Sequence, residues 1–380
     1  MHLHLSPVGR LGRLAALAIA VLVLSASAAS ALRLTTVATG LNQPKKITVT
    51  AGGDLVVALS GDGAAPRSCT DGEQRSCLDR SGAIDLITAS GHVRTLRSGL
   101  PSIAESHTDT QATGPVQALL SGGKLRVLFQ NTTIDASTGD EIYGDGGSLL
   151  DTLSTFGGGG TTVDANFGHY EAAHNPDHGE GTNVADGDDA AKDSDPYGIV
   201  AYRGGYAIAD AGGNDVLWVS PTGTIHLLAV LPTIKEGTVE AQPVPDAIAV
   251  APDGTLYVGE LGGEPFDRGT SSVYRIVPGH GATRVASGLT AIDDMTFDSS
   301  GRLLVLELDR RGLKDPGIDK GDPASGALYR VDVATGTRRL LVGRGLPMVT
   351  GVAVDGHTVD LSIDGLTTGG GRIVSFEEGS

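Results

Sequence analysis

The chain has 380 residues and a formal net charge of −17, with 56 glycines, two cysteines and only 4% aromatic residues. This acidic excess argues against nucleic acids and anionic membrane surfaces as partners, because both need a basic protein face. Abundant glycine with few aromatic side chains indicates many short strands joined by tight turns, which is typical of one all-β domain.

The first 31 residues have the three parts of a secretory signal peptide. Arg10 and Arg13 precede an apolar run at residues 14–24, and the Ala-Ser-Ala triplet at residues 29–31 offers a small-residue cleavage site. The apolar run is short for a membrane span, and an uncleaved anchor is the alternative. We expect cleavage after residue 31, no membrane insertion after the signal is removed, and a secreted, extracellular domain of residues 32–380.

A unit of four short strands then repeats along the chain. Its clearest copy has an apolar strand at residues 245–250, a Pro-Asp-Gly turn, a second strand at 256–260, and further strands at 272–277 and 283–287. The same pattern begins again near residues 44, 115, 196, 292 and 349. Four antiparallel strands in each repeat, arranged radially, form a propeller blade. The sequence therefore predicts an all-β fold, a six-bladed β-propeller with four-stranded antiparallel blades.

The two ends of the domain complement each other. The last copy stops after a third strand at residues 372–376, while residues 34–41 resemble the fourth strands at 284–289 and 339–346. We expect the N-terminal strand to join the C-terminal blade and close the ring, which removes two exposed sheet edges. An open stack of sheets is the alternative.

Loop lengths distinguish the two faces of the predicted propeller. The turns between first and second strands are short, whereas five long insertions fall on the opposite face. Binding residues gather on elaborated loops that a rigid scaffold supports, so we expect the binding site on this elaborated face. The insertions cover residues 61–82, 131–147, 169–195, 262–271 and 309–326.

Both cysteines, Cys69 and Cys77, lie in the first insertion. In an exported chain we expect them to form a disulfide that closes one small loop. A metal site would call for more thiols or nearby histidines, and a redox pair is usually closer in sequence.

Carboxylates recur at equivalent positions of the repeat. Asp246 and Asp293 begin inner strands, while Asp210, Glu260 and Glu307 stand near the ends of second strands. We expect all five near the upper mouth of the channel, where their repulsion requires a cation such as Ca²⁺ or a lysine, Lys45 or Lys46. Structural hydrogen bonds to the next turn are the alternative. The candidate ligand-binding residues are Lys45, Gln117, Tyr197, Asp210, Asp246, Glu260, Asp293 and Glu307, and the candidate metal ligands are Asp246, Glu260, Asp293 and Glu307.

The third insertion contains His169, His174 and His178. Pro176 interrupts any helix between the last two, so we expect a solvated loop or a lid over the channel rather than a transition-metal site. The sequence contains no G-x-S-x-G elbow, no P-loop and no H-E-x-x-H motif, and it nominates no catalytic residue.

Several segments together resemble the ScyD/ScyE family of exported bacterial propellers, which are related to NHL-repeat proteins. The resemblance implies a secreted six-bladed propeller without a defined reaction. Propellers of the regucalcin and gluconolactonase kind, which hold a divalent ion and open lactones, are similar in fold only. The segments that carry the family resemblance are residues 40–44, 69–84, 170–177, 195–198, 209–214 and 257–261.

These observations favour a monomeric, extracellular binding module. Its ligand would be a small molecule, a glycan or a protein that meets the elaborated face. The alternative is a divalent-metal-assisted hydrolase or lactonase, in which an ion at the channel mouth polarises a carbonyl or activates water.

Overall fold

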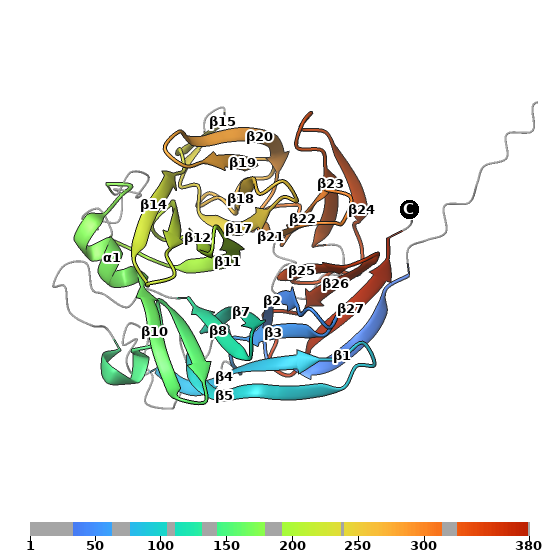
Figure 1. The fold of residues 1–380 in the computed structure, drawn as a ribbon. Coiled ribbons are helices and arrows are strands. Elements are labelled where there is room, and N and C mark those ends of the chain that lie inside the picture. Colours follow the sequence, from blue (N-terminus) through green and yellow to red (C-terminus); the bar gives the residue numbers. More distant parts are fainter. Residues whose placement is uncertain are drawn as a thin grey trace, which may run out of the picture. The chain divides into compact units, whose positions relative to one another are not determined.

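The computed structural model describes residues 33–62, 77–104, 111–130, 143–178, 192–236, 239–313 and 325–378. Its strands form six antiparallel sheets arranged in a ring (Figure 1). This is a six-bladed β-propeller, which confirms the fold predicted from the repeat. The signal peptide predicted for residues 1–31 lies outside the described residues and stays a prediction, as does the secreted location.

In each blade the first strand lies at the centre of the ring and later strands lie progressively further out. Blade 1 contains β2 (Pro44–Val49), β3 (Leu55–Leu59), β4 (Leu78–Ile87) and β5 (Val93–Ala104), with β6 (Ala112–Thr113) at its edge. Blade 2 contains β7 (Pro115–Ser121), β8 (Lys124–Phe129), β9 (Thr152–Gly157) and β10 (Gly160–Asn166), and blade 3 contains β11 (Pro196–Tyr202), β12 (Gly205–Asp210), β13 (Asp215–Val219) and β14 (Ile225–Val230).

The second half of the ring repeats this order. Blade 4 contains β17 (Pro245–Val250), β18 (Leu256–Glu260), β19 (Ser271–Val277) and β20 (Gly281–Leu289). Blade 5 contains β21 (Ile292–Phe297), β22 (Leu303–Glu307), β23 (Ala327–Val331) and β24 (Arg338–Val342). Blade 6 contains β25 (Gly351–Asp355), β26 (Thr358–Ile363) and β27 (Gly371–Glu377), and its fourth strand is β1 (Thr35–Leu41).

The pairing of β1 with β27 closes the ring as predicted. The two strands run antiparallel, from Thr35 opposite Ser375 to Leu41 opposite Gly371. Ala38 and Leu41 bury their side chains in the core between blades 6 and 1. The N-terminal strand therefore supplies both backbone pairing and apolar contacts to the last blade.

The hydrophobic core is divided among the six interfaces between blades. Each of the six large clusters draws its buried side chains from two neighbouring blades. Leu306 of blade 5 and Leu361 of blade 6, for example, are both fully buried in one cluster. Burial of such a side chain contributes about 1.5–3 kcal/mol, so most of the stabilisation lies between blades rather than within one sheet.

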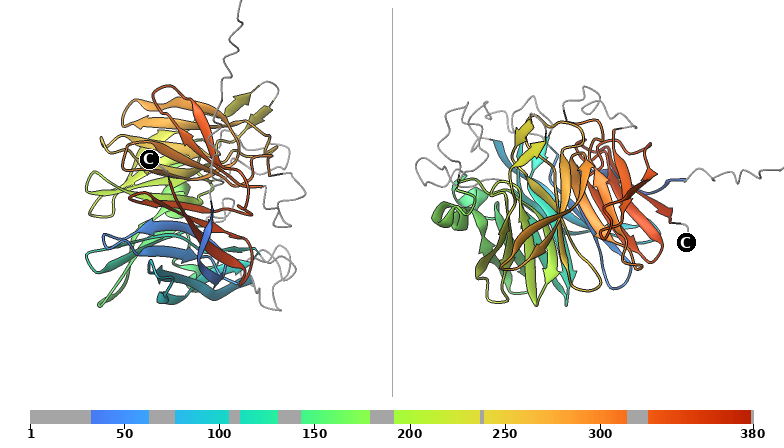
Figure 2. Two further views of the ribbon diagram at one scale, coloured as in Figure 1. Left: turned by 90° about the vertical axis from the view of Figure 1, so that its right-hand side faces the viewer. Right: turned by 90° about the horizontal axis from the view of Figure 1, so that it is seen from above.

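Tight glycine turns define one face of the ring. Gly254 and Gly301 adopt φ values of 85° and 74°, which favour glycine, and each closes a turn by donating its N–H to the residue three positions earlier. Since the strands of each blade are antiparallel, the second strands end at the opposite face. Figure 2 shows the hairpin of β15 (Ile234–Glu236) and β16 (Val239–Ala241) on that opposite face.

Two short helical elements complete the described fold. Helix α1 (Phe167–His174) begins at Asn166, whose side chain accepts from His169 N, and ends at Asn175 in the left-handed region. The 3-10 helix η2 spans Gly144–Gly147. Among the described residues, no helix has the length and apolar character needed to cross a membrane.

Candidate binding site in the central channel

Five of the six innermost strands begin with a β-bulge. In blades 1–5 the register between the first and second strands shifts directly after the first residue, whereas blade 6 is regular. A bulge interrupts strand alternation and re-aims the extra side chain. This local geometry brings several predicted residues to one end of the channel. The residues at the bulges are Lys45, Lys46, Val116, Tyr197, Asp246 and Asp293.

The Lys46 side chain crosses the channel from blade 1 to the opposite side. Its Nζ donates to the backbone carbonyl oxygens of Asp246, at 2.9 Å, and Asp293, at 2.5 Å. It also lies 3.3 Å from Asp294 Oδ1 and 4.9 Å from the centroid of the Tyr197 ring. With only 1% of its surface exposed, Lys46 has its charge offset by these protein groups rather than by water.

Asp246 and Asp293 lie beside Lys45 and Tyr197 at this end, and we call these four residues the mouth cluster. Burial raises the pKa of Asp293 to about 7, against the attraction of Lys46. Burial and the Asp293 charge hold the pKa of Asp246 well above its usual range. The pKa of Lys45 falls to about 8 because burial outweighs the attraction of Asp293. The mouth cluster is therefore a buried group of acids and one base, of which Asp293 and Lys45 have pKa values near neutrality.

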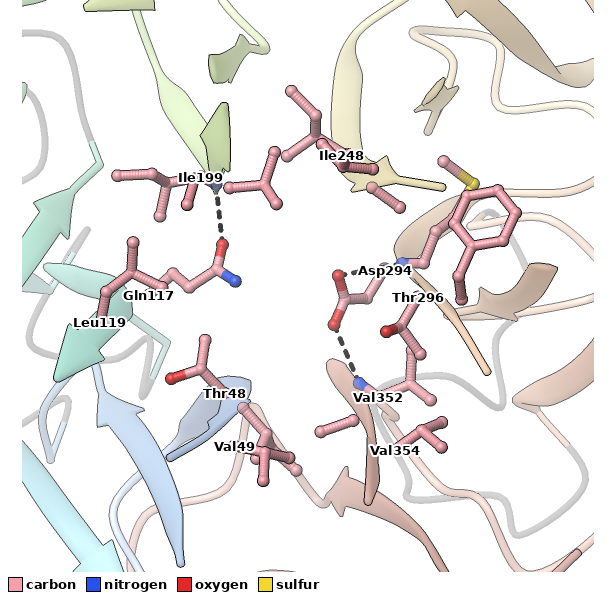
Figure 3. A pocket seen from close by; sticks show the side chains of 18 residues that line it. Thr48, Val49, Gln117, Leu119, Ile199, Ile248, Asp294, Thr296, Val352 and Val354 are labelled. Atoms are coloured by element: carbon pink, nitrogen blue, oxygen red, sulfur yellow. Dashed lines mark hydrogen bonds between the residues drawn. The ribbon is translucent and has the colours of Figure 1, made fainter. Parts of the chain in front are cut away.

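Gln117 and Asp294 form a second polar layer just below the mouth cluster. Gln117 Oε1 accepts a hydrogen bond from Ile199 N at 2.8 Å, and Asp294 Oδ2 accepts one from Val352 N at 2.9 Å. Each side chain is therefore hydrogen-bonded to the backbone of the next blade. They hold equivalent positions in blades 2 and 5, and their side chains face each other across the channel (Figure 3). These bonds fix both groups while leaving the Gln117 amide nitrogen directed inward.

Below this layer the channel opens into a cavity of about 350 Å³. All six innermost strands line it, mostly with apolar side chains such as Val49, Leu119, Phe297 and Val354. Among the described residues that line it, Asp294 alone is charged, and its side chain points into the channel (Figure 3). These four apolar side chains belong to the strand ends nearest the short turns and are partly exposed. The cavity therefore opens towards the short-turn face. The binding site expected on the elaborated face stays a prediction.

The other three predicted carboxylates have partners within their own blades. The Asp210 carboxylate accepts from Ser194 Oγ, Asp195 N and Gly213 N at 2.7, 2.7 and 3.1 Å, and burial raises its pKa to about 6. The structure thus places Asp210 in a polar cluster of blade 3 rather than with Asp246 and Asp293.

Glu260 and Glu307 occupy matching positions in blades 4 and 5. Burial raises the pKa of Glu260 to about 8, opposed by hydrogen bonds from Ser272. Burial raises the pKa of Glu307 to about 7, opposed by a hydrogen bond that it accepts from Thr290 N at 2.9 Å. Glu260 lines a separate cavity of about 330 Å³ with Arg284.

The four candidate metal ligands do not converge on one point. Asp246 and Asp293 belong to the mouth cluster, while Glu260 and Glu307 interact within blades 4 and 5. Within the described ranges, no three His, Cys, Asp or Glu side chains could hold a metal ion. The mouth residues therefore do not fit the predicted ion, and Lys45 and Lys46 supply the positive charge there.

The three histidines lie away from the channel. His169 and His174 belong to α1, which lies at the rim near blades 2 and 3 rather than over the channel (Figure 1). All three are exposed, and the His174 ring stacks on Tyr170 with centroids 4.4 Å apart. Cys77 is buried, but Cys69 lies outside the described residues, so their disulfide stays a prediction.

No family model matches the sequence, and no curated protein does. Several solved structures are similar. A structural genomics protein of unknown function from Bacteroides thetaiotaomicron has a TM-score of 0.54 at 10% identity, covering 91% of this chain and 76% of its own. A gluconolactonase from Xanthomonas campestris has a TM-score of 0.51 at 11% identity, with 91% and 90% covered. The PQQ-bound aldose sugar dehydrogenase from Streptomyces coelicolor has a TM-score of 0.50 at 14% identity, with 91% and 98% covered.

The likeness is one of fold. At such identities a shared propeller does not transfer a reaction or a ligand. The relationship to the ScyD/ScyE family stays a prediction, since neither sequence comparison found a match. The function of this protein is therefore inferred from the residues of its own channel.

Proposed function

We propose that the protein is a secreted binding module that takes a small, predominantly apolar molecule into its central channel. The observation that carries this proposal is the 350 Å³ cavity that all six blades line. Small-molecule sites are typically concave and largely apolar, with a few polar groups that orient the ligand. The channel has this composition, with Gln117 and Asp294 at its inner end.

The geometry also supports an orientation for the ligand. Both Asp294 oxygens already accept hydrogen bonds, from Met295 N, Lys46 and Val352 N. The Gln117 amide nitrogen, by contrast, donates none of the hydrogen bonds found among the described residues, and it faces the cavity (Figure 3). A ligand with one acceptor group, such as a carbonyl, would place that group against Gln117 and its apolar part between Leu119 and Val354.

Binding of the neutral, apolar fluorophore N-phenyl-1-naphthylamine tests this proposal. The wild-type protein should enhance the fluorescence of the probe with saturable binding. Leu119→Trp, which fills the channel, should weaken binding by about tenfold or more, because the probe would have to displace a packed indole. Leu340→Trp is the matched control, since Leu340 is 45% exposed on an outer strand.

Equal binding by the wild-type protein and Leu119→Trp would place the probe outside the channel and contradict the proposal. Absence of saturable binding to the wild-type protein would contradict it as well. Circular dichroism of both variants shows whether they keep the fold.

The mouth cluster supports a second candidate, hydrolysis of an ester or lactone. Asp293, with a pKa of about 7, and Lys45, with a pKa of about 8, are an acid and a base with perturbed titration in one buried cluster, as is common at catalytic sites. Turnover of γ-lactones or p-nitrophenyl acetate that Asp293→Asn abolishes would favour it. A lack of turnover by the wild-type protein would leave the mouth cluster with a structural role.

A further inference from the structure

A second group of carboxylates is buried in and beside blade 3, outside the channel. It joins the region of α1, the segment that precedes β11, and the turn between β12 and β13. Each member is at most 5% exposed. We call this group the blade 3 acidic cluster, and its members are Asp151, Glu171, Asp177, Asp210 and Asp215.

Two pairs within the cluster bring negative charges face to face. Asp210 and Asp215 are direct partners across the antiparallel β12–β13 pair, which places their side chains on one face about 5 Å apart. Ser194 Oγ lies 2.7 Å from both Asp151 Oδ1 and Asp210 Oδ2. A hydroxyl has one proton and can donate to only one of these oxygens at a time. The second short contact therefore requires a proton or a cation to offset the charge.

Oxygen-bearing groups of the cluster approach the backbone closely at Gly213. A Cβ on Gly212 would lie 2.8 Å from Asp195 N, so the turn packs directly against residues 193–195. A Cβ on Gly213 would instead meet oxygen-bearing groups, at 3.3 Å from Glu171 Oε2, 3.5 Å from Asp210 Cγ and 3.7 Å from the Asp193 carbonyl oxygen. Three groups from three segments thus converge beside Gly213.

Buried carboxylate oxygens in this cluster have no hydrogen-bond partner. Both carboxylate oxygens of Asp215 and Oε1 of Glu171 are in this state, on side chains that are 0% and 2% exposed. Leaving such atoms unsatisfied is costly, and native proteins almost always provide a partner for them. Burial, together with the charge of Asp210, raises the pKa of Glu171 to about 8 and that of Asp215 well above its usual range. Lys192, which donates to Ala172 O, lowers the pKa of Glu171.

We propose that the blade 3 acidic cluster binds a Ca²⁺ ion beside Gly213, between the groups that converge there. Glu171, the Asp210 carboxylate and the Asp193 carbonyl would be ligands, and Asp215 would contribute charge from the opposite strand. No three carboxylate, histidine or cysteine side chains in the described part of the chain can hold an ion by themselves. Backbone carbonyls and water must complete the site, and Ca²⁺ accepts both in its flexible shell of six to eight oxygens.

A bound ion would link the blade 3 acidic cluster, through residues 195–197, to the mouth cluster in the channel. Asp195 N donates to Asp210 Oδ1, and Ala211 N donates to Asp195 O at 3.0 Å. The chain then runs within two residues to Tyr197 of the mouth cluster. Bound Ca²⁺ would therefore hold α1 against blade 3 and fix the start of β11.

Calorimetric titration of Ca²⁺ alone into the full mature protein, first treated with chelator, tests the proposal. We expect one saturable site and a rise in Tm with Ca²⁺. Glu171→Gln and Asp215→Asn should each weaken Ca²⁺ binding by about tenfold or more, because they remove a ligand and a charge. Asp85→Asn is the matched control, since it neutralises a buried carboxylate in blade 1, and Asp293→Asn separates this site from the mouth cluster.

Terbium luminescence provides a readout of position. Tb³⁺ in this site should be sensitised by Tyr170, the neighbour of Glu171, so Tyr170→Phe should reduce the luminescence while calorimetric Ca²⁺ affinity is kept. Removing one repelling carboxylate should not lower the Tm of the chelator-treated protein, so loss of folding does not explain loss of binding. Absence of Ca²⁺ binding, or binding that both Glu171→Gln and Asp215→Asn retain, would overturn the proposal.

Discussion

Lys46 shows how one residue determines which part of the channel is available. Its ammonium group satisfies two backbone carbonyls and one carboxylate on blades 4 and 5. The mouth end is filled by charged groups that compensate one another, and the other end is left as an apolar cavity. The division between these two ends follows from a long cationic side chain that crosses the ring.

Lys46→Met should lower the free energy of unfolding by about 3–5 kcal/mol, because it leaves the buried Asp294 charge without its cation. Lys235→Met is the control, since the exposed Lys235–Glu240 pair should contribute about 0–1 kcal/mol. Urea unfolding measures both changes. A cost for Lys46→Met similar to that of the control would show that Lys46 does not compensate the mouth cluster.

The raised pKa of Glu260 predicts how the free energy of unfolding depends on pH. Its pKa is raised from 4.5 to about 8 in the folded protein, so between these values the folded state holds a proton that the unfolded state has released. The stabilisation from this group is therefore complete below about pH 4.5 and is lost as the pH rises towards 8, by at most about 1.4 kcal/mol for each pH unit.

Glu260→Gln should therefore flatten the decline of unfolding free energy between pH 5 and 8, measured by urea unfolding in chelator. The exposed Glu240→Gln serves as the control. An unchanged slope in Glu260→Gln would mean that Glu260 is ionised throughout this range.

At the scale of elements, β-bulges separate what sequence could and could not predict. The repeat, the strand starts and the Gly turns predicted six blades, and they placed Asp246 and Asp293 at inner strand starts. Alternation alone cannot say where a bulge re-aims a side chain, and so it could not pair Gln117 with Ile199 of the next blade. Nor could it show that Asp210 turns towards Ser194 of blade 3 instead of the channel.

Strand β1 is expected to stabilise the closed ring. Deleting residues 33–41 should expose the edge of β27 and the core around Ile373, and should give a protein that unfolds at much lower temperature or associates. A synthetic peptide of residues 33–41 should restore the Tm in trans, whereas a scrambled peptide should not. Normal stability of the truncated protein would show that closure by β1 contributes little.

The whole molecule is a closed ring of six interfaces of similar construction. Each apolar cluster joins neighbouring blades, so the six inner strands are held in a fixed circle around the channel. The cavity is lined by all six inner strands and therefore exists only in the assembled ring. No local sequence motif predicts it. For this reason the repeat predicted the channel, but it could not predict the apolar cavity at its short-turn end.

A crystal structure of the protein with N-phenyl-1-naphthylamine would show directly whether the channel binds a small apolar molecule. We expect electron density for the probe inside the channel, between Leu119 and Val354, with Gln117 at its inner end and entry from the short-turn face. Density on the elaborated face beyond Lys45, or density only on the outer surface of the blades, would show that the channel cavity is not the binding site.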